Sequence, residues 1–209
     1  MRSYPFLYEA DETTLILMTD LVMKIGGSLI SHIREITGIL HASDTAVLII
    51  PGGGVFTDTV RTCGLDGSAA HWMAIAGMEQ YGWYISSFQI PVTDTVSHSC
   101  ETKVLLPYCF LKKTDPLSHS WEITSDTIAA FIASLLGTEL VLLKSVDGIQ
   151  SHGTLMTHIT EPVTTDVVDP YFIGYVLSHA VQTTIINGKD PDRVSGVLGG
   201  NTVPGTLIP

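Results

Sequence analysis

The sequence predicts an α/β fold with a mainly parallel central sheet. Short apolar runs alternate along the chain with longer stretches at helical spacing, which is typical of βαβ units. Two of the apolar runs end in glycine-rich turns, KIGGS at residues 24–28 and PGGG at residues 51–54. Because ligands bind at the carboxyl ends of parallel strands, we expect both turns at the ligand-binding edge of the sheet.

Composition is consistent with one compact domain. The chain has 209 residues, of which 45% are hydrophobic and 15% are charged, so it can bury a large core. We expect residues 20–209 to form a single domain. Residues 1–19 lack the basic start of a signal peptide. They are either an N-terminal leader or edge segment, or the product of a start codon placed too far upstream.

Charge and cysteine usage narrow the function classes. The net charge of −11 argues against a nucleic acid partner, because a phosphate backbone requires clustered cations. A small phosphate ligand needs only a few local cations. No uninterrupted apolar run is long enough for a membrane span. The three cysteines predict reduced thiols in a cytoplasmic protein, and neither they nor the histidines show the spacing of a metal site.

The first half of the chain predicts βα units followed by a long helix. Strands are expected at residues 21–25 and 46–50, and helices at residues 29–41 and 56–62. Residues 68–88 have the length and periodicity of a long helix, and Ser68 is expected to cap it.

The second half begins with an irregular segment. Residues 90–111 predict shorter strands, as a hairpin or a lid, and the polar residues 112–121 predict a loop. A helix is expected to open at residues 124–126, to continue over residues 127–136 and to end at Gly137. The remaining expected elements are strands at residues 140–143, 183–186 and 205–208, and a helix at residues 191–198.

The two glycine-rich turns are candidates for phosphate binding. Without Cβ atoms, backbone N–H groups can approach an anion closely, and a following helix adds its positive end. Each turn taken alone fits an ordinary strand-to-helix turn as well as a phosphate site. The two together favour phosphoryl chemistry with two phosphate-bearing ligands. The candidate residues of the two turns are Gly26, Gly27, Ser28, Gly52, Gly53 and Gly54.

Two lysines and one aspartate are the candidate catalytic residues. Lys24 and Lys144 each follow the core of a predicted strand. At that edge of the sheet they can neutralise the charge on a migrating phosphoryl group. Asp126 opens a predicted helix, where it either caps free N–H groups or holds the two lysines, and neither role excludes the other.

Further polar residues are candidates for substrate binding. Arg61 offers a planar fork that suits a phosphate. His71 lies near the start of the long helix, where it either touches the acceptor or packs in the core. Asp147 and Gly148 form either a plain turn or the start of a loop that holds the nucleotide.

In the order of these motifs, the chain resembles the amino acid kinase superfamily. The matching segments are residues 24–28, 51–54, 124–130, 146–148 and 205–208. The resemblance implies a three-layer αβα sandwich and ATP-dependent phosphoryl transfer. It assigns Lys24 and residues 26–28 to the phosphates, residues 52–54 to the acceptor, Asp126 to the lysines and residues 144–148 to the nucleotide. It also implies a homo-oligomer.

Within the superfamily, the chain is most similar to an archaeal branch of methanofuran biosynthesis, through residues 70–75, 79–82 and 115–121. That branch converts 5-(aminomethyl)furan-3-yl-methyl phosphate to its diphosphate with ATP and Mg²⁺. Arg61 would then bind the phosphate of the acceptor, and a carboxylate that the sequence does not identify would bind its amine. A uridylate-type nucleoside monophosphate kinase and a non-catalytic ATP-binding scaffold remain alternatives. Residues 169–172 lack the late lysine of acetylglutamate kinases, so Lys144 is the better second lysine.

Overall fold

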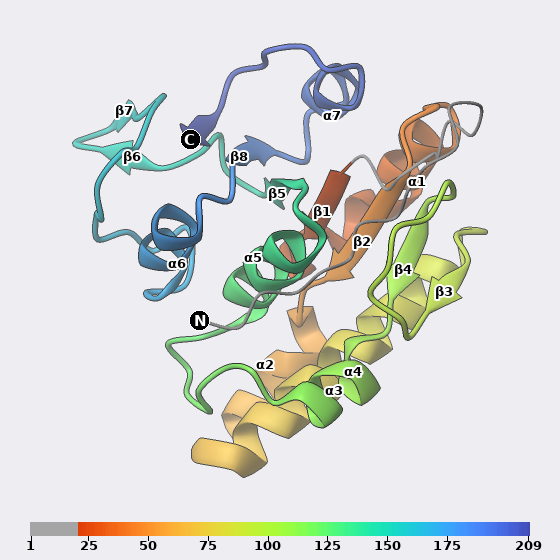
Figure 1. The fold of residues 1–209 in the computed structure, drawn as a ribbon, viewed down its shortest axis with the longest axis vertical. Helices are drawn as coiled ribbons and strands as arrows, with labels where there is room; N and C mark the ends of the chain where they lie inside the picture. The colour runs from red at the N-terminus through yellow and green to blue at the C-terminus, as the bar shows by residue number, and fades with distance from the viewer. Residues whose placement is uncertain (1–20) are drawn as a thin grey trace, which may run out of the picture.

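The computed structural model describes residues 21–209, so the expectation for residues 1–19 lies outside the described residues. Its centre is a seven-stranded sheet flanked by helices (Figure 1). The sheet strands are β1 (Leu21–Ile25), β2 (Val47–Pro51), β3 (Val92–Thr93), β4 (Lys103–Leu105), β5 (Glu139–Lys144), β8 (Thr183–Asn187) and β9 (Thr206–Ile208). The helices are η1 (Gly27–His32, 3₁₀), α1 (Ile33–His41), α2 (Gly54–Thr62), α3 (Gly67–Ser86), α4 (Pro107–Thr114), α5 (Ser125–Leu136), α6 (Phe172–His179) and α7 (Pro191–Leu198).

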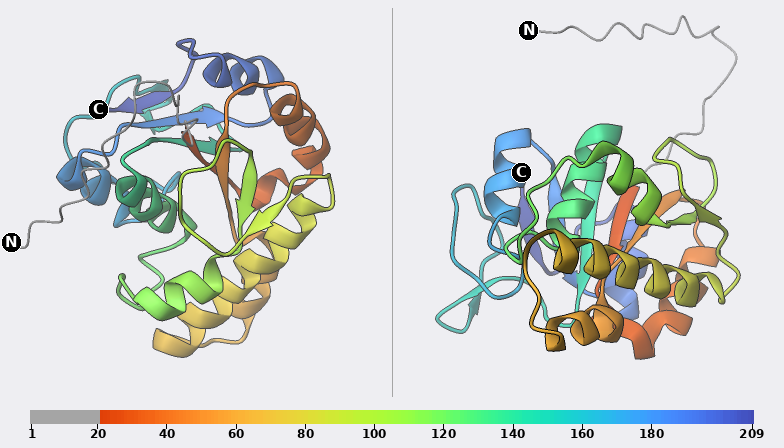
Figure 2. Two further views of the ribbon diagram at one scale, coloured as in Figure 1. Left: turned by 45° about the vertical axis from the view of Figure 1, so that its right-hand side comes forward. Right: turned by 90° about the horizontal axis from the view of Figure 1, so that it is seen from below.

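The sheet is parallel except for its last strand. Its order is β3-β4-β2-β1-β5-β8-β9, and β9 pairs antiparallel with β8. The chain builds outward from β1 through β2 on one side and then continues through β5 on the other, so the order reverses between β1 and β5. Ligands of open α/β sheets bind at such a reversal, beyond the carboxyl ends of the strands. Figure 2 shows the helices on both sides of the sheet, and the predicted three-layer αβα fold is confirmed.

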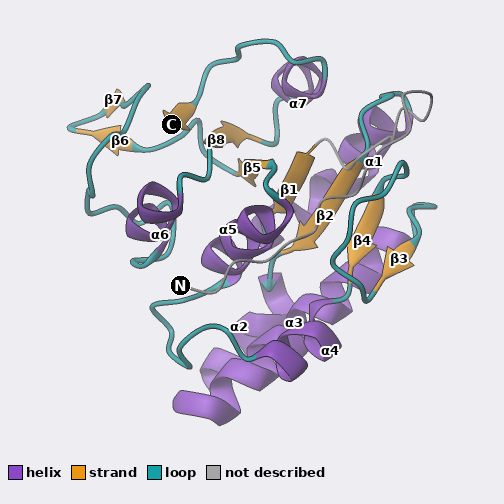
Figure 3. Cartoon of the chain, in the orientation of Figure 1, coloured by secondary structure: helices purple, strands orange, loops and turns teal. Residues whose placement is uncertain are grey.

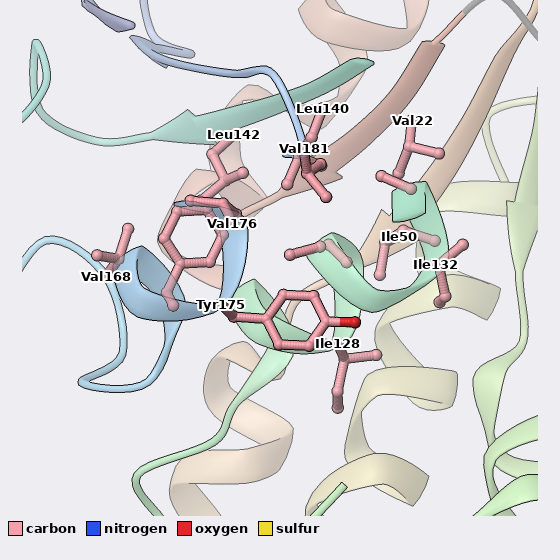
Figure 4. Close-up of a cluster of buried hydrophobic side chains, with 14 of the residues drawn as sticks. Val22, Ile50, Ile128, Ile132, Leu140, Leu142, Val168, Tyr175, Val176 and Val181 are labelled. Carbon is pink, nitrogen blue, oxygen red and sulfur yellow. The ribbon is translucent and has the colours of Figure 1, made fainter. Parts of the chain in front are cut away.

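Each face of the sheet has its own apolar core, because side chains alternate along a strand. Val22 of β1 packs on the face covered by α5 and α6, together with Ile128 of α5 and Val176 of α6 (Figure 4). Met23 and Ile25 point to the opposite face, which α1 and α7 cover. Lys24 therefore shares the face of Val22 and lies under α5. A polar residue at this otherwise buried position indicates a functional constraint.

Helices α2, α3 and α4 lie together (Figure 3), and the second half of α3 packs against the sheet through Tyr81 and Ile85. Helix α3 begins at Gly67 and not at Ser68, so the prediction of a Ser68 cap is wrong. Ser68 already lies inside the first turn, and its hydroxyl instead bonds the Nδ1 atom of His119 at 2.7 Å. Within residues 21–209, no helix combines the length and apolar character needed to cross a bilayer.

The segment after α3 differs from the prediction. Strands β3 and β4 pair in parallel, so they do not form a hairpin, and α4 occupies residues expected as strand and loop. Pro107 suits the first turn of a helix, where its missing N–H costs nothing, and Leu111 anchors the helix in the core. Asp115, at φ 40°, ends the helix in the left-handed region.

Residues 145–182 contain three elements that were not predicted. A small antiparallel pair joins β6 (Gln150–Ser151) and β7 (Thr154–Leu155), and helix α6 follows. The two strands are too short to show a period. Helix α6 buries Phe172, Ile173 and Val176, which is a helical spacing, but it spans only about two turns.

Candidate active site

The register of the sheet brings the two candidate lysines together. Lys24 of β1 lies opposite Leu142 of β5, so Lys144 is two residues further along the neighbouring strand and on the same face. Helix α5 covers this face and carries Asp126 in its first turn. The three side chains thus converge at the carboxyl edge of the sheet, where the strand order reverses.

A single carboxylate holds both lysines. The Nζ atom of Lys24 lies 2.8 Å from Asp126 Oδ1, and that of Lys144 lies 2.6 Å from Oδ2. The side chains of Lys24 and Asp126 are both 5% exposed. Burial alone would raise the pKa of Asp126, but the two ammonium groups outweigh it and lower the pKa to about 2. The carboxylate is therefore ionised throughout the neutral range.

The pKa of Lys144 lies well below its ordinary value. Burial, and then repulsion from Lys24, lower its pKa to about 8, although Asp126 acts in the opposite direction. The cluster holds two positive charges against one negative charge. The resulting net positive charge lies in a site with little solvent, where it is suited to an incoming anion.

The start of α5 is fixed by Asp169, which the sequence analysis did not identify. Its Oδ2 atom accepts hydrogen bonds from the backbone N–H groups of Thr124 and Thr127 at 2.9 and 3.0 Å. Oδ2 also accepts a hydrogen bond from the hydroxyl of Thr124, while Oδ1 accepts one from the hydroxyl of Thr127 at 2.6 Å. Asp169 thus satisfies the N–H groups of Thr124 and Thr127 at this helix end. This leaves Asp126 for the lysines.

The two glycine turns form a cradle of free donors beside Lys24. The N–H groups of Gly26 and Gly52 bond the carbonyl oxygens of Leu143 and Ile25, at 3.1 and 2.9 Å. Gly26 and Gly52 thus join the strands and do not line the cavity. The cradle consists of four backbone N–H groups that have no acceptor within residues 21–209: those of Gly27, Ser28, Gly53 and Gly54. Such groups bind phosphate oxygens.

Close packing explains why Gly27 and Gly53 carry no side chain: Gly27 contacts the other turn, and Gly53 contacts helix α2. A Cβ atom on Gly27 would lie 2.1 Å from the Cα atom of Gly54, and one on Gly53 would lie 2.0 Å from Thr57 Oγ1. Gly54 also has φ of +54°, which favours glycine. The turns therefore pack backbone against backbone, and this brings the four donors into one surface.

A cavity of about 270 Å³ opens from the cradle. One wall is the face of α2 and α3 that carries Thr57, Ala74 and Met78. The opposite wall is the segment that enters α5, through Ile123 and Ile128. The cavity therefore meets the lysines and the glycine donors, while the rest of its lining mixes apolar side chains with polar ones. This combination suits a small ligand with one anionic end.

The far end of the cavity contains a charged pair. Arg61 Nη1 lies 2.8 Å from Asp58 Oδ1, one turn earlier on α2. The guanidinium also lies 4.9 Å from the ring centroid of Trp121, within cation–π range. The indole N–H of Trp121 donates to the carbonyl of Leu65 at 3.2 Å. Arg61 is therefore held at the cavity from two sides.

His71 lines the cavity near the start of α3. Its ring stacks on that of His119, with centroids 4.2 Å apart. Both nitrogens of His119 are engaged, by Ser68 at 2.7 Å and by Asp115 at 2.8 Å. Burial, followed by repulsion from His119, lowers the pKa of His71 to about 4, so His71 is neutral at pH 7.

Asp147 and Gly148 lie beyond β5 and do not line this cavity. Asp147 Oδ1 accepts hydrogen bonds from Asn187 at 3.0 Å and Arg193 at 2.8 Å, and these partners lower its pKa. Gly148 has φ of +142°, and a Cβ atom there would lie 2.6 Å from Thr206 Oγ1. The two residues fix the loop that follows Lys144.

The structure therefore brings together most of the residues singled out in the sequence. Lys24, Lys144 and Asp126 meet directly, and the cavity joins them to the remaining lining candidates: Gly27, Ser28, Gly53, Gly54, Arg61 and His71. Thr57 and Asp58 were missed, although both share a helical face with Arg61 at spacings of three and four residues.

An αβα fold whose anion cradle adjoins two lysines defines a phosphotransferase of the small-molecule kinase class. The chain belongs to the amino acid kinase family, since that family's model matches residues 21–161. It is 30% identical over 200 residues to a protein of Methanocaldococcus jannaschii named [5-(aminomethyl)furan-3-yl]methyl phosphate kinase. The match covers 86% of this chain and 93% of that relative.

Two solved structures share the fold at low sequence identity. An isopentenyl phosphate kinase superposes with a TM-score of 0.64 at 16% identity, covering 90% of this chain and 99% of the other. A UMP kinase from Bacillus anthracis gives a TM-score of 0.65 at 13% identity, with 91% and 96% covered. These two likenesses concern the fold, whereas the family assignment rests on the sequence.

Proposed function

We propose that this kinase transfers the γ-phosphoryl group of ATP to a phosphate monoester, [5-(aminomethyl)furan-3-yl]methyl phosphate, and so forms the diphosphate of methanofuran biosynthesis. The M. jannaschii relative carries the name of this activity. The observation that carries the proposal is the pair of lysines held by Asp126, which adjoins a cavity lined by the free N–H donors of the two glycine turns.

In the proposed reaction, an oxygen of the acceptor phosphate attacks the γ-phosphorus of ATP. The bond from that phosphorus to the β,γ-bridging oxygen breaks, and ADP leaves with the electron pair. Charge accumulates on the oxygens between two anionic reactants, so catalysis depends on cations placed in advance. Lys24 and Lys144 supply these cations, and Asp126 fixes their separation.

Two anions need two sets of donors, and the chain offers one on each turn. Gly27 and Ser28 follow β1 and are assigned to the ATP phosphates. Gly53 and Gly54 follow β2, open the acceptor cavity, and are assigned to the acceptor phosphate. The loop held by Asp147 and Arg193, beyond Lys144, is assigned to the nucleoside.

Mg²⁺ would enter with ATP, and when bound it would neutralise part of the charge on the phosphates. Mg²⁺ is commonly held by phosphates, waters and few protein ligands. This fits the chain, because both oxygens of Asp126 already face lysines.

A ³¹P NMR turnover assay with ATP and Mg²⁺ tests the proposal, with the aminomethylfuran phosphate and UMP offered in parallel. We expect new diphosphate signals on the furan and none on UMP. Formation of UDP alone would assign the chain to the uridylate-type kinases. Binding of ATP without product on either acceptor would favour the non-catalytic scaffold.

A further inference from the structure

The acceptor cavity contains few groups that can recognise a positive charge. Among the described residues that line it, the side-chain carboxylates are those of Asp126 and Asp58. A substrate that carries a primary ammonium group as well as a phosphate needs a carboxylate on the protein to bind that cation. The choice between these two carboxylates follows from their surroundings.

Asp126 is already committed. Each of its oxygens lies within 2.8 Å of a lysine nitrogen, and its side chain is 5% exposed. A third cation at this carboxylate would lie against two ammonium groups in a site of low dielectric, which is costly. Moreover, this end of the cavity must receive the phosphate that takes part in the reaction.

Asp58 has the opposite character. Its side chain is 65% exposed, and Oδ1 faces Arg61 Nη1 at 2.8 Å. The second oxygen, Oδ2, accepts no hydrogen bond from any residue within 21–209. An ammonium group can therefore approach Oδ2 while Arg61 stays on Oδ1. In this arrangement Arg61 serves Asp58 and not the acceptor phosphate, for which the sequence analysis had proposed it.

The position of Asp58 along α2 matches the far end of a small acceptor. At a rise of 1.5 Å per residue, Asp58 lies about 6 Å and Arg61 about 10 Å further along the helix axis than Gly54. A monocyclic acceptor whose phosphate lies at Gly54 thus reaches Asp58 with its opposite substituent. Ile75 and Met78 of α3 also line the cavity and offer apolar surface to the ring of such an acceptor.

We propose that Asp58 is the specificity residue for the ammonium group of the acceptor. This inference rests on the proposed function, because it assumes an acceptor with both charges. Asp58 binds the primary amine through Oδ2, and Arg61, held by Asp58 and Trp121, keeps the carboxylate oriented. The pair then selects a zwitterionic phosphate monoester over one that lacks the cation.

A cycle of two enzymes and two acceptors tests this role. The enzymes are the wild type and Asp58→Asn. The acceptors are the aminomethylfuran phosphate and the analogue in which a hydroxyl replaces the amine. Asp58→Asn removes a charge-assisted hydrogen bond to the amine. We therefore expect kcat/KM for the amine acceptor to fall about tenfold or more. For the hydroxyl acceptor, kcat/KM should change less than about threefold, and the KM for ATP should not change.

Asp66→Asn is the matched control, because it removes the same charge from the loop between α2 and α3 but lies outside the cavity. An equal loss on both acceptors for Asp58→Asn would overturn the inference and leave Asp58 as a positioning residue for Arg61. An unchanged preference for the amine would also overturn it. If the wild type phosphorylates neither furan, the proposed function fails, and the inference fails with it.

Discussion

Lys24 and Lys144 lie on one face of the sheet because the register between β1 and β5 sets Lys24 opposite Leu142. A slip of one residue between these strands would move one of the lysines to the opposite face. There it would be buried among the apolar residues packed under α1 and α7. The same strand pairing that stabilises the centre of the fold therefore also assembles the proposed catalytic cations.

Replacement of Lys24 tests the proposed site most directly. We expect Lys24→Ala to lower kcat by about a hundredfold or more, because it removes preorganised positive charge from the transition state. The fold should survive, since Asp126 keeps Lys144 as a partner at 2.6 Å. Steady-state kinetics with circular dichroism measure both effects. Lys113→Ala, at an exposed residue outside the cavity, serves as the control, and wild-type kcat in a folded Lys24→Ala variant would refute the site.

Activity should decline on the alkaline side. The pKa of Lys144 is lowered to about 8, so its ammonium is charged below that pH and is lost as the pH rises through it. We therefore expect kcat/KM, which reports the free enzyme, to fall with an apparent pKa near 8. A pH–rate profile from 6 to 10 measures this fall.

The variant Lys144→Arg tests whether Lys144 causes the fall in kcat/KM at alkaline pH. A guanidinium stays protonated over this range, so the variant should lose activity overall but show no fall near pH 8. An alkaline limb that persists unchanged in Lys144→Arg would assign the titration to another group, such as the acceptor or the nucleotide.

Much of this site could be predicted from residue type and order alone. Lys24 and Lys144 follow apolar runs that are buried on both faces, so their strands and their shared edge are evident in the sequence. The glycine turns are also evident, because each directly follows an apolar run. Which glycines provide the donors could not be predicted, because Gly26 and Gly52 give their N–H groups to neighbouring strands that are distant in sequence.

Other features depend on contacts that leave no local signal. Asp169 contacts Thr124 and Thr127 from more than 40 residues away. The segment expected as a hairpin or lid instead forms the parallel pair of β3 and β4, whose register depends on β2. Asp58, by contrast, shares a face with Arg61 at helical spacing, so the period of α2 could have identified it, although the sequence analysis missed it.

Contact between the glycine turns predicts a sharp difference between two Gly→Ala changes. In Gly27→Ala the new Cβ would lie 2.1 Å from Gly54 Cα, so the turns must separate and the donors diverge. We expect a loss of about 1–3 kcal/mol in unfolding free energy and weaker ATP binding by calorimetry. Gly38→Ala in α1 meets no atom within 4 Å and should gain about 0.5–1 kcal/mol. Equal unfolding free energies for Gly27→Ala and Gly38→Ala would contradict the close contact between Gly27 and Gly54.

Removal of Asp169 should affect stability and catalysis together. Asp169→Ala leaves the N–H groups of Thr124 and Thr127 without their acceptor at a buried helix end, so we expect unfolding free energy to fall by about 2–4 kcal/mol. Because Asp126 lies in that first turn, kcat should fall while the wild-type KM for the acceptor is retained. Urea unfolding and steady-state kinetics measure the two effects. A variant that is destabilised but has full kcat would show that the lysine clamp keeps Asp126 in place without the cap.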